Sequence, residues 1–454
     1  MISPINNKFS LKLPVGILGF GKEGQSSLQW LLKQGVAVEQ IKIFDKQKPN
    51  LKHEIEVFSG ENYLENLDKC ATIIRSAGVQ PFLSELEEFS CVGGIVTSQI
   101  QMFLGLYGPK NVVGITGTMG KGSCLSMISH IFSQNQVSHL VGGNFGVPAL
   151  DLTANIDEKK VVILELSSFQ LMDLNIAPEV AVVLKTTVDH LDWHRSLDEY
   201  HLAKSRIAAM QKSEDSCVAW GAGVSAELAS KSMGKVEFIG ENNNLATLSA
   251  NIDGEKLHIN GETLDLQQCQ VEGKHQLENM AAATLVARKF GVSVKKSFAA
   301  LQNYVGLPFR LQKIAENRGV TYYNDSYATR PDATIAAVRA MSEEFALILG
   351  GSDKGVDFSQ LAAELTENKF IKAVALMGQN AEIIAKNLHK HGFSKQMQQF
   401  MSLKEAFGWV HELITKGAIL LSPASASFGL FANYVQRGEV FNEFIFEYMS
   451  KNAK

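Results

Sequence analysis

The sequence of 454 residues contains few cysteines and few prolines, 5 and 10 respectively. The cysteines are scattered and form no CxxC pair: Cys70, Cys91, Cys124, Cys217 and Cys269. An odd number of isolated cysteines argues against a disulfide framework and against a structural zinc site. No stretch reaches the ~20 apolar residues of a membrane span, and the N-terminus shows no clear cleavage signal. We therefore expect a cytoplasmic protein that does not insert into a membrane.

The sequence also lacks an excess of charge of either sign. Lys and Arg number 43 and Asp and Glu 47, for a net charge of −4. This balance excludes the basic footprint of a nucleic-acid-binding protein. Apolar residues make up 45% and charged residues 20%, an ordinary globular composition. At about 100–200 residues a domain, the length predicts two to four domains.

The first block of the chain combines a short apolar run with a glycine-rich turn. Residues 15–20 predict a buried strand that enters the pattern GxGxxG at Gly19, Gly21 and Gly24, and a helical pattern follows. A second predicted strand ends at Asp45, close to the ~20 residues expected between such glycines and an acid. This order indicates a dinucleotide-type fold with a pyrophosphate at the helix N-terminus. NAD is the usual ligand, but a nucleotide-diphosphate carrier would use the same interactions.

The second block opens with the stretch GITGTMGKGS, residues 114–123. A predicted strand runs into this loop, whose glycines let backbone N–H groups converge on phosphate oxygens while Lys121 adds positive charge. The Walker pattern asks for Ser or Thr after Gly-Lys, but Gly122 stands there and the hydroxyl comes one place later, at Ser123. In P-loop enzymes that hydroxyl binds magnesium. We expect Thr116, Thr118 or Ser123 to substitute for it, or a carboxylate to carry more of the metal.

Carboxylates and histidines follow two later strands of this block. Glu165 ends the apolar run VVILE, at the sheet edge where open α/β sheets bind ligands. The next strand leads into DHLDWH, residues 189–194, and Lys204 follows on a predicted helix. Taken alone, DHLDWH fits a solvated helix start with Asp at the N-cap. Beside a phosphate loop and Glu165, the same residues favour a metal site.

The whole chain predicts an α/β protein of three domains, each built on a mainly parallel sheet. A third block alternates strands and helices and closes with a long amphipathic helix. Short alternating runs over residues 235–272 predict a small β insertion in the central block. We place a hinge at Leu307–Pro308 and divide the chain into residues 1–107, 108–307 and 308–454.

Several motifs together resemble a known family. TGTxGK, GGNFG, LELSSFQL, DHLDWH…AKSRI, GKH…N, PFR, NDSYAT and LSPASASF occur in order over nearly the whole chain. They resemble the Mur ligases of peptidoglycan synthesis, most closely the members that add glutamate to UDP-N-acetylmuramoyl-L-alanine (UDP-MurNAc-L-alanine). The resemblance implies a Rossmann-like UDP-sugar domain, a central P-loop ATPase domain and a Rossmann-like domain for the amino acid. It further implies a monomer that uses ATP and two Mg²⁺ ions, with no nucleic-acid partner.

The resemblance also assigns roles by position. The implied catalytic residues are Lys121, Glu165, His190 and Lys204. The implied ATP contacts are Gly117, Thr118, Gly120, Lys121, Gly122, Ser123, His275, Asn279, Arg310 and Asp325. The implied UDP-sugar contacts are Gly19, Gly21, Gly24, Asp45, Ser76 and Asn144. The implied amino-acid contacts are Thr329, Lys354, Ser427, Phe428 and Tyr434. The implied metal ligands are Glu165, His190, Ser123 and Lys204, the last as a carbamate.

Some positions depart from the family's pattern. Gly122 replaces the Walker hydroxyl, Tyr327 stands where the glutamate-adding members have Lys, and Arg330 replaces the following Asn. The side-chain carboxylate of glutamate needs a cationic partner, which Lys354 or Arg330 could supply. The amino acid therefore stays open between D-glutamate, L-glutamate and another.

We expect an ATP-dependent acid–amino-acid ligase that works through an acyl phosphate. Its residues would position the substrates and neutralise charge. One alternative is a ligase like folylpolyglutamate synthase, although such enzymes begin near the phosphate loop. A nicotinamide dehydrogenase would leave Lys121 and Glu165 unexplained. A binding protein that has lost catalysis is also compatible with Gly122.

Overall fold

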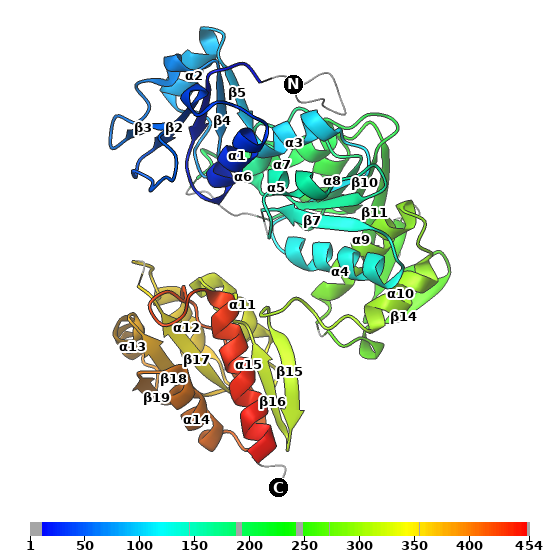
Figure 1. Cartoon of the computed structure of the whole chain (residues 1–454). Helices are drawn as coiled ribbons and strands as arrows, with labels where there is room; N and C mark the ends of the chain where they lie inside the picture. The colour runs from blue at the N-terminus through cyan, green and yellow to red at the C-terminus, as the bar shows by residue number, and fades with distance from the viewer. Residues whose placement is uncertain are drawn as a thin grey trace. The chain divides into compact units, whose positions relative to one another are not determined.

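The computed structural model describes residues 11–144, 146–187, 193–241, 248–271, 273–353 and 355–451. Their contacts divide the chain into two compact units, Met1–Tyr304 and Val305–Lys454. The first unit contains two sheets and the second contains one, each flanked by helices (Figure 1). Three mainly parallel sheets confirm the fold class predicted from the sequence. The division between the units falls three residues before the predicted hinge.

The first sheet is wholly parallel. Its strands are β1 Val15–Leu18, β2 Ile41–Asp45, β3 Glu56–Ser59, β4 Thr72–Arg75 and β5 Ile95–Ser98. Its helices are α1 Lys22–Lys33, α2 Ser84–Cys91 and α3 Gln99–Tyr107. The order β3-β2-β1-β4-β5 reverses direction between β1 and β4. Such a switch point opens a crevice at the carboxyl ends of the strands, so the loops after β1 and β4 face the same space.

The second sheet has nine strands in the order β14-β13-β12-β11-β10-β9-β6-β8-β7. They are β6 Val112–Thr116, β7 His139–Gly143, β8 Val161–Glu165, β9 Val180–Val183, β10 Ser216–Trp220, β11 Lys235–Glu241, β12 Leu248–Asp253, β13 Lys256–Ile259 and β14 Glu262–Asp265. The helices are α4 Lys121–Gln134, α5 Ala149–Leu152, α6 Ser168–Leu171, α7 Leu197–Ala209, α8 Gly223–Ala229, α9 His275–Lys289 and α10 Val294–Gln302. The strands predicted over residues 235–272 extend this sheet: β11 and β12 continue it in parallel, and β13 and β14 form an antiparallel edge.

A continuous hydrophobic core joins the first two sheets. Met102 and Phe103 of α3 are fully buried and belong to the same cluster as Leu150 of α5 and Ile207 of α7. In Figure 1, α1 and α3 of the first sheet lie against α5 of the second sheet. Burial of large apolar side chains is the main stabilising term in folding. The first sheet is therefore fixed against the second, and contacts between them can be described residue by residue.

The third sheet has the order β15-β16-β20-β17-β18-β19, with only β15 antiparallel to its neighbour. Its strands are β15 Gln312–Asn317, β16 Val320–Asn324, β17 Phe345–Gly351, β18 Ile371–Gly378, β19 Gln396–Phe400 and β20 Gly417–Leu421. Its helices are α11 Pro331–Ala340, α12 Ser359–Glu367, α13 Ala381–Lys390, α14 Leu403–Leu413 and α15 Tyr434–Lys451. Pro331 begins α11, where proline costs no hydrogen bond because the first N–H of a helix has no intrahelical partner. Within the described residues, no helix has the length and apolar character needed to cross a membrane.

Candidate active site

The phosphate loop connects β6 to α4 at the carboxyl edge of the central sheet. Gly117 and Gly120 have φ values of +150° and +82°, which residues other than glycine rarely adopt. A Cβ at Gly120 would lie 2.5 Å from Oδ1 of Asn279, so glycine is required sterically as well. The Lys121 ammonium donates to the carbonyl oxygens of Gly117, at 3.1 Å, and Thr118, at 2.9 Å. The predicted strand–loop–helix arrangement is present, with the lysine folded over the loop.

A second lysine reaches the same loop from α7. Lys204 is 2% exposed, and its Nζ donates to the Gly117 carbonyl at 2.8 Å. The Tyr200 hydroxyl, one helical turn earlier, lies 3.0 Å from Oγ1 of Thr118. Lys121 and Lys204 therefore converge on one carbonyl oxygen, and α7 is tied to the phosphate loop. Cations placed here can neutralise the charge of a phosphoryl group.

Glu165 ends β8, the strand beside β6, and is 4% exposed. Its Oε1 accepts a hydrogen bond from Nδ2 of Asn144 at 2.9 Å. Its Oε2 is buried and makes no hydrogen bond to any residue that the structure describes. A buried carboxylate oxygen without a donor is costly unless a cation or water completes its surroundings. This atom fits a magnesium ion, which prefers oxygen ligands.

Asn144 and Glu165 form a hydrogen-bonded pair, although the resemblance assigns them to different parts of the site. The resemblance places Asn144 with the UDP-sugar, but its side chain lies against Glu165 at the central sheet. The backbone reinforces the pair, since the Asn144 N–H donates to the Glu165 carbonyl oxygen at 2.8 Å. Asn144 is therefore positioned to orient the carboxylate whether or not it also contacts a substrate.

Two of the predicted site residues, His190 and Lys354, lie outside the described residues, as do Asp189 and Asp192. Within the part that is described, no three acidic, histidine or cysteine side chains form a metal-sized cluster. His194, from the same motif, is 3% exposed, and its Nε2 lies 2.9 Å from Oγ of Ser168. The predicted two-ion site therefore stays a prediction, with Glu165 as its described part.

The start of α9 lies beside the phosphate loop. His275 begins this helix, and Asn279, one turn later, is 4% exposed and borders Gly120. Burial lowers the pKa of His275, which favours its neutral form. Burial also raises the pKa of Glu278, whose Oε1 accepts the Lys185 N–H at 2.7 Å. The tertiary structure thus brings residues about 150 positions apart in the sequence to one loop.

A pocket of about 370 Å³ opens at the first sheet. It is lined by Gly19, Asp45, Lys46, Tyr63, Gly78, Val79, Gln80, Leu83 and Trp193. Gly24 packs so closely that a Cβ would lie 2.2 Å from the Gly19 carbonyl oxygen, while Oγ of Ser76 donates to that oxygen at 2.6 Å. Gly21 is the N-cap of α1, which leaves N–H groups at the helix start for an anion.

Asp45 has a structural role that the sequence does not reveal. Its Oδ2 accepts the Phe20 N–H at 2.6 Å, and its Oδ1 accepts the Gln47 N–H at 2.8 Å. The carboxylate therefore holds the glycine loop and the turn after β2 together.

Glu23 of α1 joins this pocket to the central sheet. Its Oε2 accepts the Ala77 N–H at 2.9 Å, and its Oε1 accepts from Nε2 of Gln170 on α6 at 2.6 Å. The loop after β4, which carries Ser76, is thus connected both to α1 and to α6, the helix that follows Glu165. Sequence reasoning missed Glu23 because a charged residue in the first turn of a helix usually faces solvent.

Three residues of the second unit, Arg310, Tyr327 and Tyr434, pack on one another. The Arg310 guanidinium lies 4.0 Å from the ring centroid of Tyr327, and that ring packs edge-to-face on Tyr434, with centroids 4.9 Å apart. Tyr327 and Tyr434 were singled out from the sequence separately, and they meet only in the fold. Arg330, the other departure, is exposed and lies 3.3 Å from Asp332.

Asp325 is a buried acid at the end of β16. Its Oδ2 accepts from Oγ of Ser422 at 2.7 Å, and its Oδ1 accepts the Leu311 N–H at 2.9 Å. Burial raises its pKa to about 7, although these hydrogen bonds and Arg310 and Arg437 act in the opposite direction. Asp325 thus titrates close to neutrality.

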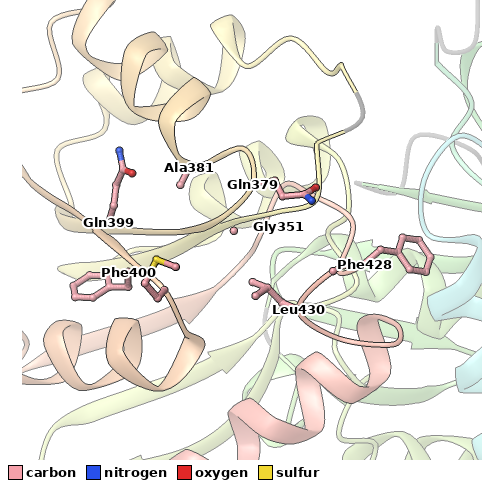
Figure 2. A pocket seen from close by; sticks show the side chains of 10 residues that line it. Gly351, Gln379, Ala381, Gln399, Phe400, Phe428 and Leu430 are labelled. Carbon is pink, nitrogen blue, oxygen red and sulfur yellow. The ribbon is translucent and has the colours of Figure 1, made fainter.

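A second pocket, of about 390 Å³, lies at the carboxyl ends of β17 and β18. Figure 2 shows Gly351, Gln379 and Leu430 close together at this pocket, with the Phe428 ring extending away from Leu430. Phe428 is 56% exposed, whereas its neighbour Ser427 is 3% exposed. Thr329 is also exposed. The predicted amino-acid-binding residues therefore include both buried and accessible side chains within the second unit.

A phosphate loop beside a buried carboxylate on a mainly parallel sheet, in a chain with two further α/β sheets, defines a multidomain α/β enzyme that handles phosphate. Comparison with known proteins is more specific. The Mur ligase middle domain matches residues 115–287, and the Mur ligase glutamate ligase domain matches residues 309–425. The chain belongs to the Mur ligase family and is a ligase.

Curated relatives narrow the group further. A protein of Clostridium kluyveri, named UDP-N-acetylmuramoylalanine–D-glutamate ligase, is 30% identical over 447 residues, covering 95% of this chain and 96% of that protein. A protein of Acetivibrio thermocellus with the same name is 31% identical, covering 97% of this chain and 98% of its own length. This chain is thus a Mur ligase of the same type as the D-glutamate ligases, as the motifs predict.

Solved structures agree on the fold. The MurF ligase of Thermotoga maritima, in complex with ADP, is 17% identical, with a TM-score of 0.57 and coverage of 99% of this chain and 97% of that chain. The alanine ligase MurC of Thermotoga maritima is 15% identical, with a TM-score of 0.56 and coverage of 97% and 100%. At this identity the likeness concerns architecture alone.

Proposed function

We propose that this ligase joins the carboxylate of UDP-MurNAc-L-alanine to the amine of glutamate, with hydrolysis of ATP to ADP and phosphate. The observation that carries the proposal is the convergence of Lys121 and Lys204 on the phosphate loop beside the buried Glu165. The names of the curated relatives support D-glutamate as the first amino acid to test.

The proposed reaction has two steps. A carboxylate oxygen of UDP-MurNAc-L-alanine attacks the γ-phosphorus of ATP, which releases ADP and gives an acyl phosphate. The glutamate amine then attacks the carbonyl carbon, loses a proton and expels inorganic phosphate to give the amide. Lys121 lies where it can neutralise charge on the transferring phosphoryl group, Lys204 lies beside the same loop, and the N-terminus of α4 supplies backbone N–H groups.

Glu165 is the residue best placed to hold Mg²⁺, which would neutralise the phosphate oxygens of ATP. Its Oε2 lacks a hydrogen-bond donor among the described residues, while Asn144 fixes the other oxygen. Oγ of Ser123 and the residue His190 complete the proposed ligand set, and Lys204 would join it as a carbamate. The proposed ATP contacts also include His275 and Asn279 of α9 in the first unit, and Arg310 and Asp325 in the second unit.

The first experiment measures phosphate release from ATP with UDP-MurNAc-L-alanine and either D-glutamate or L-glutamate. We expect release only when all three substrates are present, and faster release with D-glutamate. Glu165→Gln keeps the size of the side chain but removes its charge, so it should lose ligation. Glu158→Gln, in an exposed loop, is the matched control and should retain it. Full activity of Glu165→Gln would contradict the proposed role.

A second candidate function is a Mur-type ligase for L-glutamate or another amino acid. Tyr327 favours it, because the family resemblance places a lysine there and the structure instead shows a tyrosine ring packed on Tyr434. A panel of amino acids with radiolabelled UDP-MurNAc-L-alanine separates the two functions. Product with L-glutamate and none with D-glutamate would establish the second.

A further inference from the structure

Trp193 lies between β9 and α7 of the central sheet, yet its side chain lines the pocket of the first sheet. Every other described residue lining that pocket lies between Gly19 and Leu83. Trp193 is half-buried, so part of its indole remains accessible. Its sequence motif, DHLDWH, points to metal chemistry and gives no reason to expect the ring in a nucleotide pocket.

Contacts from both sheets fix the position of the indole. Its centroid lies 4.2 Å from that of Phe169 on α6, and 6.0 Å from that of Phe82 in the loop of the first sheet. Its Nε1 donates to the Gly78 carbonyl oxygen at 3.4 Å. Its own carbonyl oxygen accepts from Nε2 of Gln80 at 2.8 Å. The ring is therefore held in place by surrounding residues before any ligand arrives.

The remaining lining gives the pocket its chemistry. Tyr63 supplies a second aromatic ring, Lys46 an exposed ammonium and Asp45 a carboxylate. The N-terminus of α1 lies at Gly21, beside the same loop. Aromatic faces suit a nucleobase, while an ammonium and a helix N-terminus suit a diphosphate. Both oxygens of Asp45 already accept backbone hydrogen bonds, which increases the share of recognition left to the rings.

We propose that the Trp193 indole contacts the bound uridine diphosphate group, so that the central sheet completes the nucleotide pocket of the first sheet. This inference rests on the proposed function, which supplies the uridine nucleotide. Trp193 then contacts the substrate and also packs on Phe169 of α6. Because α6 follows β8, which ends at Glu165, this packing links the pocket to the central sheet.

Intrinsic fluorescence tests the contact directly. The protein has four tryptophans: Trp30, Trp193, Trp220 and Trp409. Trp30 and Trp220 are 4% and 9% exposed, and Trp409 lies in the second unit. Titration with UDP should change the fluorescence of the wild-type protein and of Trp409→Phe, but not that of Trp193→Phe. Calorimetry should show that Trp193→Phe still binds UDP, within about threefold of the wild-type affinity, since a phenyl ring can still stack.

Kinetics supply the second readout. Trp193→Ala should raise the KM for UDP-MurNAc-L-alanine about tenfold, with the KM for ATP unchanged, because base stacking is lost while the phosphate loop is intact. A purely structural role would instead change both constants or the unfolding midpoint alone. If Trp193→Ala does not fold, the fluorescence of Trp193→Phe decides the question.

Three results would overturn the inference. They are wild-type affinity of Trp193→Ala for UDP, a UDP-dependent signal that persists in Trp193→Phe, and UDP binding to the wild-type protein with no fluorescence change. Each of these results contradicts only the inference about Trp193. If the wild-type enzyme still ligates, the proposed function holds. Failure of the wild-type protein both to bind UDP and to ligate would remove the proposed function together with this inference.

Discussion

Nε of Arg75 lies 3.0 Å from Oδ2 of Asp173, and the two residues form an ion pair between the first and second sheets. Arg75 is fully buried at the end of β4. Its guanidinium also donates to the Ser76 and Phe169 carbonyl oxygens, each at 3.3 Å, and to that of Val79. One side chain thus connects the wall of the pocket at the first sheet to α6, the helix that follows Glu165.

We predict that Arg75→Met destabilises the first unit by about 2–4 kcal/mol, because it leaves the Asp173 carboxylate without its cation. Denaturant unfolding of the full chain measures the loss. Arg75→Met combined with Asp173→Leu should recover part of it. The control is Lys42→Met, which breaks the more exposed pair with Glu56 and should cost less than about 1 kcal/mol. Additive effects of the Arg75 and Asp173 changes would show that the pair is not the source of stability.

Lys121→Ala should lower kcat by at least about a thousandfold while the protein stays folded. The reason is the loss of a cation that neutralises the phosphoryl group in the transition state. Phosphate release and circular dichroism measure the two quantities. Lys159→Ala, in an exposed loop, is the control lysine and should behave as wild type. Normal turnover in a folded Lys121→Ala protein would rule out the assigned ATP site.

Lys204 should act as a carbamate in the metal-loaded enzyme. An ammonium beside two magnesium ions is repelled, whereas a carbamate presents an anionic oxygen that suits a hard cation. Lys204→Ala should be nearly inactive, and short-chain carboxylic acids should restore part of the activity. Mass spectrometry under carbon dioxide should detect the modification in the wild-type protein. Full activity of Lys204→Ala without added acid would contradict the prediction.

Gly122→Ser should lower the magnesium concentration required for half-maximal rate, because a hydroxyl at the second residue of α4 restores an oxygen ligand. A magnesium titration of phosphate release measures the change. If Ser123 already serves this role, Ser123→Ala should raise the requirement and Gly122→Ser should have no effect. A metal requirement unchanged in both variants would mean that neither position contributes a ligand.

Asp325 should make the stability of the second unit depend on pH. Its folded-state pKa of about 7 lies above the ordinary value of 3.8, so the folded protein prefers the protonated form. The stability contributed by this preference is complete below about pH 4 and is lost as the pH rises through 7. Asp325→Asn cannot titrate, so its unfolding midpoint relative to wild type should rise between pH 5 and 8. A constant difference over this range would show that Asp325 does not titrate there.

The sequence by itself determined the class of fold, the phosphate loop and the family. These features depend on local order: a buried strand followed by glycines and a lysine, an acid at a strand end, and the alternation of strands with helices. Pro331 at the start of α11 and Glu165 at the end of β8 were therefore predictable, because each depends on its neighbours in the chain.

Only the tertiary structure decided which distant residues meet. Arg75 and Asp173 are 98 positions apart, Tyr327 and Tyr434 lie on different elements, and Trp193 reaches a pocket whose other lining residues end at Leu83. Asn144 likewise proved to be the partner of Glu165. Sequence patterns report the period and the caps of one element, but the packing of one element on another follows from burial of side chains along the whole chain. In the sequence, the one local sign that Arg75 is buried and paired is its place at the end of the apolar strand TIIR, residues 72–75.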